Sequence, residues 1–507
     1  MPWIPGQPSL EDWENRFPSC DAVPTVRCED LSPDAFRAEF MSKNLPVMIT
    51  GITDDWRARR EWVTKDGQPD VVAMSELFGD AKVLVVDCDE AIDTDLKRRE
   101  MPFREFASWW QSSETRKRAA AGAAAREKLY VKDWNFVGDF PAYGAYDTPP
   151  HVRDDWLNDC GSNEDDKNEN ENENENENDD ARLRPGSFRF VYLGVEGTWT
   201  PMHVDVARSY SWSTNVCGRK KWLMVPPSRV KYLRHRDGSG RLIPDVRAAR
   251  LASARADFPD ASLAAPLTVH QPPGALLFVP SCWAHQVHNE TDCLSINHNW
   301  FNDCTFGVSS AYLRDESRMI RLGLPDRDDR ADGVLCQRLL ARKAGINQLH
   351  LGSIGVWGLR RVLDSTHSEA FQEKRHRARR LANVFQPLRH LVHETHFFAT
   401  RDVCEREFGE FNEGNEYSYR PCHPGVGSLL GLVVSAPRAR SPTEETSRAR
   451  KEADAFVESF DVDPWEEDAD RLAEIVDVLR RAGDDPVFGE ESDEEAPEEP
   501  RADRQPP

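Results

Sequence analysis

The sequence predicts a mainly β protein with flanking helices, whose central region is a sheet structure of the jelly-roll kind. Short apolar runs of strand length dominate residues 188–301. They lie at 188–193, 221–225, 275–279 and 294–297. Turn-forming pairs such as Pro226-Pro227 and Asp237-Gly238 separate the runs. Short strands with Gly and Pro between them are typical of β-sandwiches and barrels.

The first 160 residues are expected to hold helices and the first strands of this sheet structure. Ser32 followed by Pro33 predicts a helix start, because Ser caps a helix and Pro fits its first position. Apolar runs predict strands at 45–49, 83–86 and 129–131. Residues 101–110 have the pattern of a short amphipathic helix.

The net charge of −23 is concentrated in two segments. Residues 162–180 hold ten Asp and Glu against one Lys, a net of −9, and residues 441–507 hold 23 against eight Lys and Arg, a net of −15. The rest of the chain is therefore close to neutral. Because Asn and Glu alternate through the first segment, 161–185 is expected to be a disordered insertion. An acidic chain of this kind lacks the signature of a nucleic-acid-binding protein.

Cysteine usage and hydropathy indicate a reducing compartment. Eleven scattered cysteines without a CxxC pair argue against a zinc ribbon and against a disulfide framework. The N-terminus lacks the basic and apolar regions of a signal peptide, and the longest apolar run, 425–436, is too short to span a bilayer. We therefore expect a cytoplasmic protein, with the nucleus as the alternative, and no membrane contact.

Beyond Asn302 the pattern becomes helical. Apolar residues at helical spacing occur around 335–340, 354–363 and 371–396, which predicts a helical region over 303–436. These helices either cover the β-core or form a homodimer surface, and the sequence does not decide between the two. Residues 437–507 are expected to be an acidic tail, mostly disordered, with one helix at 464–481.

His203 and Asp205 form the first half of a predicted metal site. They are two residues apart, so on a strand their side chains point to the same face. An imidazole and a carboxylate are two of the three ligands of the facial triad that holds non-haem Fe(II).

A distant strand must bring the third ligand, and His285, His288 and His298 are the candidates. A strand that ends at Pro280 and turns through the next two residues delivers His285 first. His288, three residues on, faces the opposite side of an extended strand. The predicted triad is therefore His203, Asp205 and His285.

Two His and one Asp also hold zinc in hydrolases, so a metal alone is ambiguous. Lys220, 17 residues after His203, favours a different chemistry. A lysine on an apolar strand is costly to bury unless it is paired, and a dicarboxylate co-substrate supplies the partner. Iron would chelate one end of 2-oxoglutarate and Lys220 would bind its distal carboxylate, with hydroxyls from Thr200 and Tyr130 completing the hydrogen bonds.

Four stretches of the sequence together resemble the jumonji-C oxygenases: 198–205 (Thr-Trp-Thr-Pro-Met-His-Val-Asp), 218–222 (Gly-Arg-Lys-Lys-Trp), 278–285 and 295–300. In particular they resemble the jumonji domain-containing protein 4 family, lysyl hydroxylases of the translation termination factor. Residues 130–134 and 208–218 strengthen this likeness, which covers about 45–302. It implies a double-stranded β-helix core, the cupin fold, at 186–302.

The resemblance also implies roles for individual residues. His203, Asp205 and His285 match the family's iron ligands, and Lys220 matches its 2-oxoglutarate lysine. The positions of Thr200, Tyr130 and Asn297 match polar positions on the co-substrate, whereas Ser213 stands where some relatives have Asn.

The predicted function is a dioxygenase that uses Fe(II), 2-oxoglutarate and O2 to hydroxylate a lysyl residue of a peptide chain release factor. Within the same class, the alternative is an N-methyl-lysine demethylase of histones or other proteins. In another class, the alternative is a catalytically silent scaffold of the same fold. For the ammonium of the target lysine, Asp133 and Trp134 are weak candidate contacts.

Overall fold

A computed structural model describes residues 9–92, 95–119, 128–160, 188–324 and 329–364, together with residues 380, 383, 384 and 387. The chain divides into two compact units, Met1–Arg361 with Asn383–Val426, and Val362–Ala382 with Gly427–Pro507. Nearly all of the described residues lie in the first unit, which contains both sheets.

All of the strands precede residue 303, with helices interspersed among them, and the last three helices follow. The strands are β1 (Thr25–Arg27), β2 (Val47–Thr50), β3 (Lys82–Ile92), β4 (Asp95–Pro102), β5 (Leu129–Trp134), β6 (Arg189–Gly194), β7 (Trp199–His203), β8 (Tyr210–Cys217), β9 (Lys220–Val225), β10 (Leu267–Gln271), β11 (Leu276–Val279), β12 (Ala284–Asn289) and β13 (Cys293–Trp300). The α-helices are α1 (Leu10–Arg16), α2 (Pro33–Phe36), α3 (Arg57–Glu61), α4 (Val71–Phe78), α5 (Phe103–Ala119), α6 (Phe136–Asp139), α7 (Trp156–Asp159), α8 (Pro227–Val230), α9 (Ala248–Ala254), α10 (Asp303–Gly323), α11 (Asp329–Ala344) and α12 (Gln348–Asp364).

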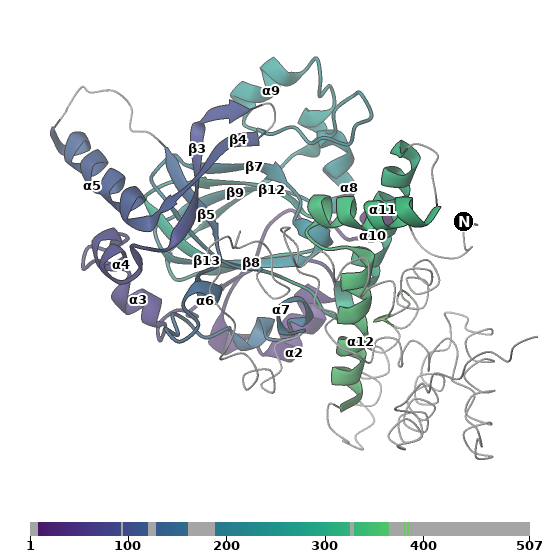
Figure 1. Ribbon diagram of the computed structural model, residues 1–507, viewed down its shortest axis with the longest axis horizontal. Coiled ribbons are helices and arrows are strands. Elements are labelled where there is room, and N and C mark those ends of the chain that lie inside the picture. Colours follow the sequence, from purple (N-terminus) through teal and green to yellow (C-terminus); the bar gives the residue numbers. More distant parts are fainter. Residues whose placement is uncertain are drawn as a thin grey trace, which may run out of the picture. The chain divides into compact units, whose positions relative to one another are not determined.

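The strands form two sheets. The large sheet has the order β1-β2-β11-β8-β13-β6-β5-β3-β4, and the small sheet has the order β10-β9-β12-β7. Every pairing is antiparallel except that of β1 with β2. Figure 1 shows the strands of both sheets stacked in the centre, with α3, α4 and α5 gathered at one end of them. From β7 to β13 the chain crosses between the two sheets at every step except from β9 to β10, which are neighbours in the small sheet. Such repeated crossing is the winding of a jelly roll.

Three apolar clusters hold these layers together. The largest packs α2, α4 and α5 onto the outer face of the large sheet and includes Trp62, Phe106 and Trp212. A second cluster lies between the two sheets, where Met48 and Leu277 of the large sheet meet Trp222 of the small one. A third covers the outer face of the small sheet with the segment between β9 and β10, and it includes the residues Met202, Leu223, Val230, Leu233 and Ile243.

Sequence patterns locate most strands of the central region. The predicted runs correspond to β2, β3, β5, β6, β9, β11 and β13, and Ser32 caps α2 through the backbone N–H of Ala35 at 3.1 Å. The helix expected at 101–110 begins at Phe103 and continues to Ala119. The pattern missed β4, β8 and β10.

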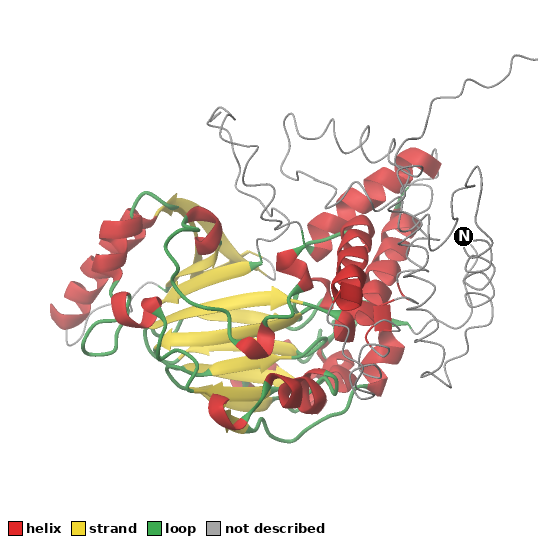
Figure 2. Ribbon diagram, turned by 90° about the horizontal axis from the view of Figure 1, so that it is seen from below, coloured by secondary structure: helices red, strands yellow, loops and turns green. Residues whose placement is uncertain are grey.

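Several expectations fall outside the described residues. They are the disordered insertion at 161–185, nearly all of the helix at 371–396, and the acidic tail with its helix at 464–481. Within the described part of the chain, none of the helices is long and apolar enough to cross a membrane. Figure 2 shows the strands gathered in one block with helices at either end of it.

Candidate metal and co-substrate site

Three predicted ligands come together where β7 ends. They are His203, Asp205 and His285. His203 is the last residue of β7 and lies directly opposite His285 on β12. One ligand atom from each of the three side chains lies within 4.8 Å of the other two. The two imidazole centroids are 4.2 Å apart, and His285 Nε2 is 4.0 Å from Asp205 Oδ2. The structure therefore brings together the three side chains that the sequence predicts as metal ligands.

Both histidines present the same ring nitrogen to the centre of the trio. The Nδ1 atom of His203 lies 2.8 Å from the carbonyl oxygen of Pro201, and that of His285 lies 3.1 Å from the carbonyl oxygen of Trp283. Since a carbonyl only accepts, each Nδ1 carries the proton and donates. The lone pair is left on Nε2, which is the tautomer that binds a metal.

The carboxylate of Asp205 is oriented by Ser211, whose hydroxyl donates to Oδ2 at 2.7 Å. Ser211 lies in β8 of the large sheet. Asp205 follows the end of β7 in the small sheet. This hydrogen bond fixes the rotation of a carboxylate that the backbone alone leaves free to turn.

Burial disfavours a positive charge on His203. Burial, reinforced by the neighbouring imidazole of His285, lowers the pKa of His203 to about 4. Two imidazole nitrogens and one carboxylate therefore face one another in the trio. This donor set, with its lone pairs already directed inward, fits a divalent iron ion.

Pro201 lies at a bulge near the end of β7. The register between β7 and β12 shifts between the pairs His285–His203 and Val287–Thr200, so β7 contains one extra residue there. Proline has no N–H for the ladder and is tolerated at such bulges. Because of the bulge, His203 and Thr200 both lie on the face of β7 that carries their inward-facing partners on β12.

Lys220 is the buried cation of the site. Its side chain begins β9, is 2% exposed, and donates a hydrogen bond of 2.7 Å to the hydroxyl of Ser295. Among the residues that the structure describes, no carboxylate forms an ion pair with it. Burial lowers the pKa of Lys220 to about 8. A buried ammonium with only a neutral partner is a site for an anion.

A row of polar side chains on the large sheet faces Lys220. Alternate residues of β13 share a face, so Ser295 and Asn297 point to the same side, opposite Tyr192 and Phe190 of β6. Asn297 accepts a hydrogen bond of 3.1 Å from the hydroxyl of Ser213. The sequence had left the role of Ser213 open, and here it anchors Asn297.

Tyr130 and Thr200 lie on strands that border this row. Tyr130 is buried on β5, opposite Gly194 of β6, and burial raises the pKa of its hydroxyl. A Cβ atom at Gly194 would lie 2.5 Å from Cδ2 of Tyr130, so glycine makes room for the ring. Thr200 lies opposite Val287 of β12.

The two other histidines considered for the triad lie elsewhere. His288 stacks on Trp199, with ring centroids 5.7 Å apart and an angle of 4° between the planes, and it points away from His285 as the alternation of β12 requires. His298 is buried in the large core, where it bonds the hydroxyl of Tyr146 at 2.6 Å. Trp134 is also buried in that core, so it is wrong as a contact for the substrate.

Sequence reasoning missed Ser211 and Ser295, which hold Asp205 and Lys220. Each bond joins one sheet to the other, and its partners are 6 and 75 residues apart. Neither serine belongs to the spacing that identified the triad. The signal that identifies them is the pairing of β8 with β13, which places Ser211, Ser213 and Ser295 on one inward face.

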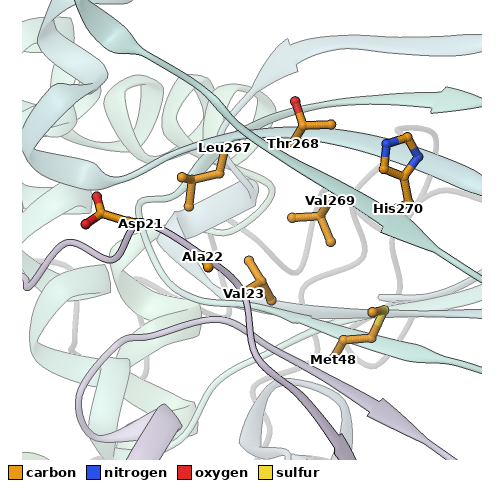
Figure 3. Close-up of a pocket in the computed structure, with 8 residues that line it drawn as sticks. All are labelled: Asp21, Ala22, Val23, Met48, Leu267, Thr268, Val269 and His270. Carbon is orange, nitrogen blue, oxygen red and sulfur yellow. The ribbon is translucent and has the colours of Figure 1, made fainter.

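A separate pocket of about 240 Å³ lies beside the edge strand β10. Figure 3 shows its lining, which comes from β10, from Met48 and from the segment before β1. The residues are Asp21, Ala22, Val23, Met48, Leu267, Thr268, Val269 and His270. None of the predicted site residues is among them, so this pocket is distinct from the trio and Lys220.

Comparison with known proteins agrees with this geometry. A family described as "Cupin-like domain" matches residues 33–306. "Arginine-specific demethylase JMJ20" of Arabidopsis thaliana is 37% identical over 333 residues, which are 64% of this chain and 67% of that protein. "2-oxoglutarate and iron-dependent oxygenase JMJD4" is 35% identical in Gallus gallus, over 63% of this chain and 70% of the relative, and 35% identical in Homo sapiens, over 61% and 69%.

Proposed function

This chain belongs to the cupin-like family of 2-oxoglutarate and iron-dependent oxygenases, and from that premise we propose that it hydroxylates a lysyl residue of a translation release factor. It is a dioxygenase whose cofactor is Fe(II) and whose co-substrates are 2-oxoglutarate and O2. The proposal concerns the target protein, the position of attack and the roles of the individual residues.

The buried ammonium of Lys220 carries the assignment of the co-substrate. A metal trio alone also suits a hydrolase, so the trio does not decide between the two kinds of enzyme. Lys220 is 2% exposed and its only hydrogen-bond partner in the described chain is the hydroxyl of Ser295. A dicarboxylate anchored by one end on the metal brings its other carboxylate to such a cation.

In this proposal, His203 and His285 bind Fe(II) through Nε2, and Asp205 binds it through its carboxylate. The hydroxyl of Ser211 donates to that carboxylate and keeps it from rotating. Lys220 binds the distal carboxylate of 2-oxoglutarate. Thr200, Tyr130 and Asn297 supply polar contacts around it. Bound iron supplies the oxidising chemistry, in which 2-oxoglutarate and O2 yield succinate, CO2 and one oxygen atom for the target C–H bond.

The walls of the site contribute placement and exclusion of water. Trp222 lies 5.6 Å from the imidazole of His285, and Met224 and Val287 continue the apolar wall between the sheets. An apolar wall on one side and a polar row on the other orient a ligand that has a charged and an uncharged part.

The lysyl target is supported by the resemblance of the motifs at 198–205, 218–222 and 208–218 to release-factor lysyl hydroxylases. A release factor acts on cytoplasmic ribosomes, so the proposal places the enzyme in the cytoplasm. One observation favours a second candidate, protein demethylation, because the Arabidopsis relative is named an arginine-specific demethylase. The two reactions share the site and differ in where the target carbon is held.

The experiment uses the full chain with Fe(II), 2-oxoglutarate and a purified release factor. We expect succinate to form and mass spectrometry to locate one added oxygen on a lysine of the factor. Asp205→Ala is the control and should abolish both signals. A lost methyl group on methylated arginine or lysine peptides, with no oxygen added to the factor, would replace hydroxylation by demethylation.

A further inference from the structure

Asp133 has an unusual backbone conformation beside the site. Its φ is +54°, in the left-handed region that few residues other than glycine, Asn and Asp adopt. The register between β5 and β6 shifts between the pairs Val131–Leu193 and Trp134–Val191, so β5 bulges at Lys132 and Asp133. Bulges next to active sites re-aim a side chain away from the face that simple alternation gives it.

The bulge turns the carboxylate of Asp133 toward Tyr192. The hydroxyl of Tyr192 donates to Oδ1 of Asp133 at 2.6 Å. In a regular strand, the side chain of Asp133 would point away from that of Lys132. It would then lie with Val131 on the face that packs into the large core. Instead Asp133 is exposed, and its second oxygen has no hydrogen-bond or ion-pair partner within the part of the chain that the structure describes.

Tyr192 connects this carboxylate to the co-substrate site. It lies opposite Ser295, the partner of Lys220, and its ring is 5.8 Å from Nζ of Lys220. Burial, followed by the negative charge of Asp133 and to a smaller extent that of Asp205, raises the pKa of Tyr192. Tyr192 therefore contacts the exposed carboxylate of Asp133 through its hydroxyl and lies close to the buried ammonium of Lys220 through its ring.

The charges of the site are separated along this line. Lys220 is buried at the co-substrate end, and Nζ of Lys132 lies 5.9 Å from the ring of Tyr130 on the same strand. Asp133 provides a negative charge at the exposed surface. The cationic end suits 2-oxoglutarate, and the anionic end suits a positively charged target.

We propose that Asp133, held in place by the hydroxyl of Tyr192, receives the cationic end of the target side chain, a lysyl ammonium or an arginyl guanidinium. This inference rests on the proposed function, because it names the group that recognises the target at the same site. It makes Asp133 a specificity-determining residue and Tyr192 a positioning residue.

The substitution Asp133→Asn isolates the charge. An asparagine tolerates a positive φ as well as an aspartate does, and its amide oxygen still accepts the hydrogen bond of Tyr192. Glu100→Gln is the matched control, since Glu100 is an exposed carboxylate of β4 that pairs with Lys82 at the edge of the large sheet.

The test needs no identified target protein. The full chain with Fe(II) and 2-oxoglutarate is given n-butylammonium or n-propylguanidinium, the ends of lysyl and arginyl side chains, with n-butanol as the neutral counterpart. We expect each cation that fits to change the basal rate of succinate formation saturably, and n-butanol to leave it unchanged. In Asp133→Asn the half-saturating cation concentration should rise about threefold to tenfold, the range of a partly exposed ion pair.

The KM for 2-oxoglutarate should stay within about twofold of the wild-type value in Asp133→Asn, because the charge lies outside the co-substrate subsite. A wild-type enzyme that ignores both cations, or an Asp133→Asn variant that responds to them as wild type does, overturns the proposal. An equal rise in the KM for 2-oxoglutarate also overturns it, since Asp133 would then serve only to position Tyr192.

A second measurement separates this inference from the proposed function. With a release factor as substrate, kcat/KM of Asp133→Asn should fall at least about tenfold while Glu100→Gln stays unchanged. If the cations act through Asp133 and no release factor is hydroxylated, the subsite stands and the identity of the target fails. The relative response to the two cations shows whether lysyl or arginyl targets fit better.

Discussion

The ammonium of Lys220 and the hydroxyl of Ser295 form a hydrogen bond of 2.7 Å that joins the small sheet to the large one. Both side chains are buried, and the serine is uncharged. The fold therefore holds a positive charge between its two layers without a compensating carboxylate from the described chain. The behaviour of this lysine provides the most direct tests of the site.

Replacing Lys220 with Met should weaken co-substrate binding and at the same time stabilise the ligand-free protein. Removing one partner of a buried, hydrogen-bonded charge pair costs about 2–5 kcal/mol, so Kd for 2-oxoglutarate should rise about thirtyfold or more. The melting temperature without co-substrate should rise, because a buried unpaired charge is removed. Titration calorimetry and thermal unfolding measure the two effects, with the exposed Lys82→Met as control. A lower melting temperature would contradict this, because it would show that other groups already compensate the charge of Lys220 in the ligand-free protein.

The affinity for 2-oxoglutarate should depend on pH through the same residue. Burial lowers the pKa of Lys220 from 10.5 to about 8. Above pH 8 the free protein loses the positive charge, so Kd for 2-oxoglutarate should rise as pH increases from 8 toward 10. In Lys220→Arg the charge persists through this range, and Kd should be flat. Equal slopes in the two proteins would assign the pH dependence to another group.

The stability of the ligand-free protein should follow the opposite direction. The pKa of Lys220 is lower in the folded chain than in the unfolded one, so the cost of burying its charge is fully present below pH 8 and disappears as pH rises to 10.5. The free energy of unfolding of wild type should therefore approach that of Lys220→Met over this window. Urea unfolding of both proteins at several pH values measures the difference, which a pH-independent gap between them would contradict.

Ser211→Ala should weaken metal binding without affecting the fold. It removes the hydrogen bond that orients the carboxylate of Asp205, and loss of such a partner typically costs about tenfold to a hundredfold in metal affinity. Ser213→Ala is a matched control two residues along β8, because its hydroxyl bonds Asn297 instead. Titration of the metal-free proteins with Mn(II), followed by electron paramagnetic resonance, measures the affinities. Similar losses in both variants would deny Ser211 a special role.

Gly194→Ala should destabilise the protein and displace Tyr130. The new methyl group would lie 2.5 Å from both Cδ2 of Tyr130 and Oγ1 of Thr198. Overpacking of this kind costs about 1–3 kcal/mol, and a shifted tyrosine should also raise the KM for 2-oxoglutarate. Gly323→Ala, at the end of α10 with open space around it, is the control and should unfold as wild type does. Unchanged stability in Gly194→Ala would mean that β5 and β6 accommodate the methyl group at little cost in free energy.

The sequence predicts strands that contain a continuous apolar run, and it misses strands in which polar residues separate the apolar ones. β4 contains Lys97, Arg98, Arg99 and Glu100 and is recognisable only once β3 is seen to pair with it at the edge of the sheet. β10 carries exposed Thr268 and His270 for the same reason, since an edge strand needs no apolar outer face. β8 has a polar inward face formed by Ser211, Ser213 and Asn215, so it contains no continuous apolar run.

The trio was predictable because two of its members are adjacent in sequence and the third follows a recognisable turn. Cys282 adopts a φ of +64° in that turn, between β11 and β12, and the strand that follows brings His285 opposite His203. The partners that orient the trio and Lys220 depend on strand register, which no local pattern specifies. No local pattern predicts the bulge at Asp133 either, because aspartate permits a left-handed backbone conformation without requiring it.

The difference in depth between Lys220 and Asp133 has a kinetic consequence. The lysine is 2% exposed, whereas the aspartate is at the surface, and Tyr192 stands between them. A target side chain seated on Asp133 would stand in the path to Lys220. The two reactants would then have a compulsory order of addition, 2-oxoglutarate before the protein, and an excess of protein substrate added first would inhibit turnover.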